Sequence, residues 1–118
     1  MSKSSNSLFV FGVYLIGMGA GLLLAPNMVL GVFGFPVTDE VWPHVVGVLA
    51  LVLAFYYLSA ARADMRVFAK WTVPVRIGVF IAFASFVAAG LVGPVMIMLG
   101  AVDLRGALWT GWALKSER

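Results

Sequence analysis

The stretch Gly90-Leu91-Val92-Gly93-Pro94 lies within the longest apolar run of the chain and decides how many helices that run contains. Read as one helix, residues 77–102 form a single long span, since a membrane core needs about 20 apolar residues. Two glycines and a proline within five residues are, however, typical of a turn. The alternative is a hairpin of two helices at about residues 74–89 and 94–114, with Pro94 in a first turn that tolerates its missing N–H.

The distribution of positive charge favours the hairpin. The chain has 8 Lys and Arg residues, and none lies in residues 26–43 or 90–93, the outer connections of a four-span arrangement. Basic residues that flank membrane helices remain on the cytoplasmic side, and a three-span arrangement would place Lys115 and Arg118 outside. We therefore predict four transmembrane helices, both termini in the cytoplasm, and an outer hairpin between the last two.

The other two predicted spans precede this hairpin. The first covers about residues 8–25 and follows a Ser-rich start; it exceeds the 7–15 residues of a signal-peptide core, so we interpret it as a retained helix. A short apolar segment at 27–35 is expected in the outer interface. The second span covers about residues 44–61, and a hydrophilic turn at 62–70 follows it. The prediction is a single all-α transmembrane domain, residues 1–118, with the architecture of a four-helix bundle.

Composition supports the membrane class. Of 118 residues, 63% are hydrophobic and 11% charged, whereas soluble domains are about half apolar and a quarter charged. The location expected for this multi-pass chain is a cell inner membrane. The absence of cysteine excludes disulfides and thiolate metal sites within the chain. We attribute the net charge of +3 to membrane topology rather than to nucleic-acid binding.

Three charged residues within the apolar helices form the candidate site: Arg76, Asp103 and Arg105. Asp103 is expected near the middle of the membrane, where a lone charge costs about 2.5–3.5 kcal/mol on insertion scales and normally faces a partner or a cavity. Arg76 is the predicted partner, because it enters the membrane from the same side. Two interpretations remain open: a structural ion pair, or a polar pocket for an anionic lipid, a small polar ligand or a proton.

Small residues at helical spacing predict close helix contacts. Gly17 and Gly21 form a G-x-x-x-G pattern, and Gly47, Gly106 and Gly111 occupy comparable positions on later helices. In lipid, helices associate by close backbone approach over such residues. We expect these glycines to pack helices within one chain, with a homodimer face as the alternative.

Catalytic and metal-binding patterns are weak. Asp39, Glu40 and His44 cluster before the second span, and we interpret them as a solvated helix start rather than a metal site. The spans yield no Ser/His/Asp nucleophile arrangement and no phosphate-binding glycine loop. No metal and no cofactor are therefore predicted, and an enzyme is the less favoured class.

The layout resembles the small bacterial membrane proteins grouped as DoxX-like. The resemblance covers about residues 12–114 and is carried by Ala25-Pro26, Phe33-Gly34-Phe35-Pro36, Trp42, Gly47, Ala101-Val102-Asp103 and Ala107-Leu108-Trp109-Thr110. It implies a four-helix membrane fold, and some members of the grouping are associated with quinone-linked respiratory enzymes. No functional residue is carried over from it.

The favoured function is a non-enzymatic helper subunit, or a lipid- or quinone-binding module, with an intramembrane polar pocket. The alternatives are an oligomeric small transporter or channel, and a subunit of a membrane redox or lipid-modifying enzyme. The partners expected are membrane lipid and either further copies of the chain or a larger membrane complex.

Overall fold

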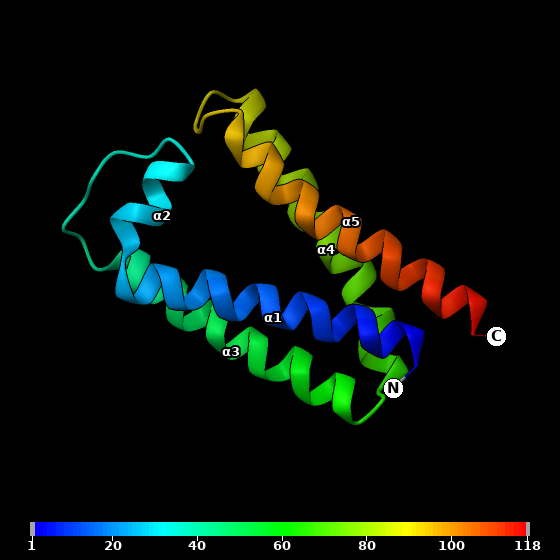
Figure 1. Cartoon of the computed structure of the whole chain (residues 1–118). Helices are drawn as coiled ribbons and strands as arrows, with labels where there is room; N and C mark the ends of the chain where they lie inside the picture. The colour runs from blue at the N-terminus through cyan, green and yellow to red at the C-terminus, as the bar shows by residue number, and fades with distance from the viewer. Residues whose placement is uncertain (1, 118) are drawn as a thin grey trace.

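The computed structural model describes residues 2–117 and is helical throughout that range apart from its connecting segments. The helices are α1 (Lys3–Leu24), α2 (Pro26–Val32), α3 (Trp42–Arg62), α4 (Arg66–Ala88) and α5 (Val95–Ser116) (Figure 1). The all-α prediction is confirmed, with four long helices and one short one.

Three of the long helices, α1, α3 and α4, are long and apolar enough to cross a membrane. These three support the classification as a transmembrane protein. Helix α5 is as long as α1, at 22 residues. Asp103 and Arg105 interrupt its apolar sequence, however, and it does not belong to this group. A fourth span therefore stays a prediction.

The turn predicted at residues 90–93 is present. Helix α4 ends at Ala88 and α5 begins at Val95, with Pro94 immediately before it. Gly90 has a φ of +75°, a backbone conformation that glycine adopts without steric penalty. The N–H of Leu91 reaches back to the carbonyl of Phe86 at 3.0 Å, a bond that closes the end of α4.

Two predicted helix starts were wrong. Helix α1 begins at Lys3 rather than at residue 8, since the Ser2 hydroxyl caps it by accepting the N–H of Ser5 at 3.2 Å. Helix α4 begins at Arg66 rather than at residue 74, which reduces the predicted turn at 62–70 to three residues and places Pro74 inside the helix. Asp64 allows this short turn by adopting a φ of +55°, which Asp tolerates better than most residues.

The long helices form two antiparallel pairs, α1 with α3 and α4 with α5 (Figure 1). Helix α1 also contacts α2, α4 and α5 and so joins the two pairs. Both ends of the described chain lie at one end of the molecule, next to the α3–α4 turn. We call this the polar end. Helix α2 and the α4–α5 turn lie away from it, where the two pairs diverge (Figure 1).

The buried core lies close to the polar end, where all four long helices meet. It contains Leu8, Phe11, Leu15, Ala54, Tyr57, Ala60, Ala61, Ala69 and Leu114. Phe11 packs on Tyr57 with ring centroids 5.1 Å apart. This core fixes how the two helix pairs are placed relative to each other near the polar end. It does not extend to the opposite end, where the pairs diverge.

The predicted glycines divide into two groups. Gly47, Gly106 and Gly21 pack closely against neighbouring residues, and Gly111 is in ordinary contact with α4. Gly17, in contrast, is exposed, and a Cβ there would meet nothing within 4 Å. Within the described part of the chain, Gly17 therefore packs against no other helix.

Candidate functional site

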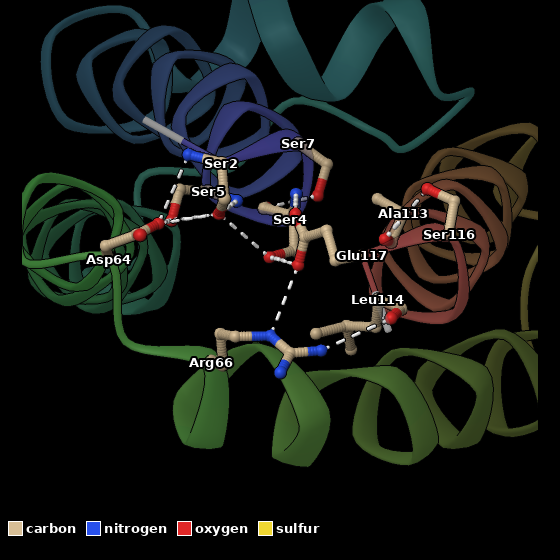
Figure 2. A network of polar contacts seen from close by, with 10 residues as sticks. All are labelled: Ser2, Ser4, Ser5, Ser7, Asp64, Arg66, Ala113, Leu114, Ser116 and Glu117. Atoms are coloured by element: carbon tan, nitrogen blue, oxygen red, sulfur yellow. Dashed lines mark hydrogen bonds and ion pairs between the residues drawn. The ribbon is translucent and has the colours of Figure 1, made fainter.

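A network of polar contacts joins three segments at the polar end (Figure 2). The N–H and hydroxyl of Ser4 donate to the Glu117 carboxylate at 2.7 and 3.0 Å. The hydroxyls of Ser2 and Ser5 donate to Asp64. Arg66 donates from Nε to Glu117 at 3.2 Å. The start of α1 is thus bonded both to the α3–α4 turn and to the end of α5.

These contacts change the acidity of both carboxyl groups. Hydrogen bonds from the hydroxyls of Ser2 and Ser5 and from the Ser2 N–H lower the pKa of Asp64 from 3.8 to about 2. For Glu117, desolvation acts to raise the pKa, but the hydrogen bonds from Ser4 and the charge of Arg66 outweigh it and the pKa is lowered. Both groups are therefore ionised at neutral pH.

A second series of contacts leads from the polar end into the helix pairs. Ser7, which is 1% exposed, donates to the Ser4 carbonyl at 2.6 Å and lies 2.7 Å from the Thr110 hydroxyl. Because a Ser hydroxyl has one proton, Thr110 is the donor in that second bond. Thr110 in turn accepts from Nη2 of Arg76 at 2.7 Å. The bonds therefore all point from Arg76 toward the polar end.

Arg76 is the largest fully buried side chain, only 1% exposed. Its Nη2 also donates to the Thr72 hydroxyl at 3.1 Å, and its Cζ lies 4.9 Å from the ring centroid of Phe11. Both contacts suit a guanidinium, which donates in plane and stacks on aromatic faces. Its Nη1 is buried and has no hydrogen-bond partner among residues 2–117. That atom lies 2.9 Å from the position that a Cβ on Gly106 would occupy.

A cavity of about 250 Å³ lies between the α1–α3 pair and the α4–α5 pair. Its wall is apolar over most of its area and includes Leu15, Met18, Phe83, Met96 and Leu99. Asp103 is the one charged residue in the wall, and Tyr14 adds a hydroxyl-bearing ring. The cavity is thus an apolar space whose wall includes one acidic residue, Asp103.

The structure does not bring the three predicted site residues into one pocket. Asp103 lines the cavity, whereas Arg76 lies against Gly106, one helical turn from Asp103 on α5. Across the described part of the chain, no ion pair joins Asp103 to Arg76. Arg105 is exposed and lines a different groove, of about 190 Å³, that shares Phe11 and Tyr14 with the cavity. The partners of Arg76 are instead two threonines.

The sequence analysis did not identify the buried polar residues whose hydrogen bonds connect Arg76 to the polar end. Ser4, Ser7 and Thr110 are each at most 1% exposed. One signal was available: Thr72 and Arg76 are four residues apart, a spacing that brings side chains together on a helix. His44 lies in the first turn of α3, the helix start predicted for it, but it is bonded rather than only solvated. Its Nδ1 donates to the Leu23 carbonyl at 2.9 Å and links the start of α3 to the end of α1.

Comparison of the chain with family models, with curated proteins and with solved structures found no match. Among the residues that the structure describes, no three His, Cys, Asp or Glu side chains lie close enough together to hold a metal ion. The function is therefore inferred from the geometry of the site.

Proposed function

We propose that this protein binds one membrane amphiphile, a lipid or a quinone, in the cavity beside Asp103, and acts as a helper or carrier module without catalysis of its own. The cavity carries the proposal. Ligand sites are typically concave, mostly apolar and marked by a few polar groups, and this cavity combines an apolar wall with the Asp103 carboxyl group and Tyr14.

The volume and the polar groups define the class of ligand. At about 250 Å³, the cavity is smaller than the roughly 300–1,000 Å³ of sites for drug-sized molecules. It suits a single acyl chain or one substituted ring. A carboxyl group and a phenol exchange hydrogen bonds with hydroxyl or carbonyl oxygens, which the head of a quinol or quinone and the glycerol region of a lipid both contain.

A binding function is favoured over transport by the distribution of polar groups. Hydrogen bonds lead from the polar end as far as Arg76. Beyond Asp103, toward α2, the cavity wall consists of apolar residues such as Leu22, Leu30 and Phe33. A polar substrate would need polar partners along its whole path across the membrane. One chain supplies them only between the polar end and Asp103.

The orientation is proposed on the same basis. The start of α1, the α3–α4 turn and the end of α5 are bonded to one another. The basic residues in or beside these segments are Lys3, Arg62, Arg66, Lys70 and Lys115. The positive-inside rule assigns such an end to the cytoplasm. We propose four spans, with α5 as the fourth, in an inner membrane; membership of the DoxX-like grouping stays a prediction.

Native mass spectrometry of the protein extracted in mild detergent tests the proposal. The wild type should retain one lipid or quinone. Met96→Trp, which fills the cavity, should lose it, while Met98→Trp on the same helix should keep it, because Met98 is 69% exposed and does not line the cavity. Asp103→Asn should retain less of the ligand.

Equal retention by Met96→Trp and the wild type would contradict the proposal. So would flux of a polar solute through liposomes of the purified protein that Asp103→Asn abolishes, since that result assigns transport. A protein partner that co-purifies in fixed stoichiometry would identify the complex that the module serves.

A further inference from the structure

A second groove lies at the polar end, between α4 and α5. Its volume is about 610 Å³. Its rim carries three cations, Arg66, Lys70 and Lys115. Its floor is apolar and consists of Val73, Pro74, Gly111 and Leu114.

The groove has an excess of positive charge. Among residues 2–117, no acidic side chain lines it. Within residues 2–117, the one ion pair is that of Arg66 with Glu117, so Lys70 and Lys115 have no acidic partner there. Arg66 is held in place, because its Nε bonds to Glu117 and its Nη2 donates to the Leu114 carbonyl at 3.3 Å (Figure 2). The rim therefore presents a fixed guanidinium and two ammonium groups to an anion.

The cations of the rim lie nearer the polar end than part of the apolar floor does. Lys70 and Pro74 are four residues apart on α4, and Gly111 and Lys115 are four apart on α5, so each pair lies on one helix face. In both pairs the lysine is the residue nearer the polar end. Pro74 and Gly111 have short or absent side chains, and a Cβ on Gly111 would reach only Val73, at 3.8 Å. The apolar floor thus extends one turn deeper than the cations.

We propose that this groove binds an anionic phospholipid of the leaflet at the polar end. The phosphate would lie among Arg66, Lys70 and Lys115, and an acyl chain would follow the floor past Pro74 and Gly111. Basic pockets between membrane helices bind anionic head groups in this way. Charge at the surface and apolar area beneath it match the two parts of a phospholipid. The groove is separate from the cavity at Asp103 and requires nothing of the function proposed for that cavity.

Titration of the delipidated protein in detergent tests this site, with phosphatidylglycerol, phosphatidylcholine and inorganic phosphate as probes and native mass spectrometry as the readout. Each basic residue near an anionic lipid surface contributes roughly fivefold in affinity. Phosphatidylglycerol should therefore bind Lys70→Gln/Lys115→Gln about 25-fold more weakly than the wild type. Arg62→Gln is the matched control, because Arg62 is an exposed cation at the same end but outside the groove.

Two further variants separate lipid binding from misfolding. Lys70→Arg/Lys115→Arg keeps both charges and should bind phosphatidylglycerol like the wild type. Gly111→Leu fills the floor and should weaken phosphatidylglycerol without changing the response to inorganic phosphate. Equal affinity for phosphatidylglycerol and phosphatidylcholine, or full displacement of the lipid by equimolar inorganic phosphate, would overturn the proposal. Equal losses in the Gln and Arg double variants would also overturn it, because charge would then not be the determinant.

Discussion

Gly19 and Gly47 face each other where α1 crosses α3. A Cβ atom on Gly47 would lie 2.8 Å from the carbonyl oxygen of Gly19, and one on Gly19 would lie 2.9 Å from the carbonyl oxygen of Gly47. Both distances are too short for a real Cβ, and the opposing atoms belong to the backbone. The pair therefore sets how closely the two helices approach, which is how small residues stabilise helix pairs in lipid.

We expect Gly47→Ala to lower the thermal stability of the protein in detergent, because α1 and α3 must separate to admit the methyl group. Overpacking of this kind typically destabilises by about 1–3 kcal/mol. Gly17→Ala is the matched control: the site is open, and replacing a helical glycine by alanine is favourable by up to about 1 kcal/mol. A loss of stability in Gly17→Ala together with a change in oligomer size would instead assign Gly17 to a homodimer face.

The Thr110 hydroxyl should matter more to stability than its size suggests. It accepts from Arg76 and donates to Ser7, so Thr110→Val leaves a buried charge and a buried hydroxyl each short of one partner. Hydrogen bonds to charged groups contribute about 1.5–3 kcal/mol, and we expect a loss of that order in thermal unfolding. Thr110→Ser keeps the hydroxyl and should remain close to the wild type. A loss in Thr110→Ser with none in Thr110→Val would mean that packing of the methyl group, and not the hydroxyl, is what counts.

Coupling between Asp103 and Arg76 stays a prediction, now with a defined geometry. The two residues form no direct ion pair. The Nη1 of Arg76, which has no hydrogen-bond partner among residues 2–117, lies against Gly106, and Gly106 is one helical turn from Asp103 on α5. Asp103→Ala should destabilise the protein, and adding Arg76→Met should recover part of the loss, because breaking one side of a charge pair is worse than removing both. Strictly additive effects in this double-mutant cycle would show that the two side chains act independently.

The polar end should give the protein a specific sensitivity to acid. The pKa of Asp64 is lowered from 3.8 to about 2, so its contribution is complete above about pH 4 and is lost as the pH falls through 2. The melting temperature in detergent should therefore decrease between pH 4 and pH 2. Asp64→Asn should be less stable at pH 7 and show a smaller decrease over that range. A decrease of the same size in Asp64→Asn would assign the acid sensitivity to other groups, with Glu117 as the first candidate.

The predicted topology can be tested with reporter fusions. Reporters placed after Ser116 and within residues 63–65 should both report the cytoplasm, and one inserted near Thr38 should report the outer side. The α3–α4 turn at 63–65 is a better insertion site than residues 66–70, because the latter already belong to α4. A C-terminal reporter on the outer side would restore three spans.

Local signals in the sequence predicted the elements well. The turn at 90–93 was recognisable because glycine and proline determine the backbone conformation locally, independently of the residues packed around them. The start of α1 was not, since Ser residues usually favour caps and turns over helix interiors. Here their hydroxyls are bonded to Asp64 and Glu117, more than 50 residues away in the chain.

The contacts between helices were harder to predict, for a physical reason. From residue 8 onward, helix α1 is apolar on nearly all of its surface, so hydrophobic periodicity does not distinguish the face toward α3 from the face toward lipid. The G-x-x-x-G pattern indicated Gly17 as a packing residue, whereas the face of α1 that packs on α3 contains Gly12 and Gly19. In the same way, charge complementarity pointed Arg76 to Asp103, whereas neutral threonines are its hydrogen-bond partners.

The bonds of the first serines also bear on the order of events during biosynthesis. Ser7 meets Thr110, 103 positions further along the chain, and Ser4 meets Glu117, 113 positions further. A nascent chain emerges from its N-terminus, so α1 enters the membrane long before either bonding partner, Thr110 or Glu117, has been translated. Its serines must wait in interfacial water while α3 and α4 are made and inserted. Arrival of the last helical turn of α5 is then the step that lets the first turn of α1 leave the water, so this turn is among the last parts of the fold to reach its final contacts.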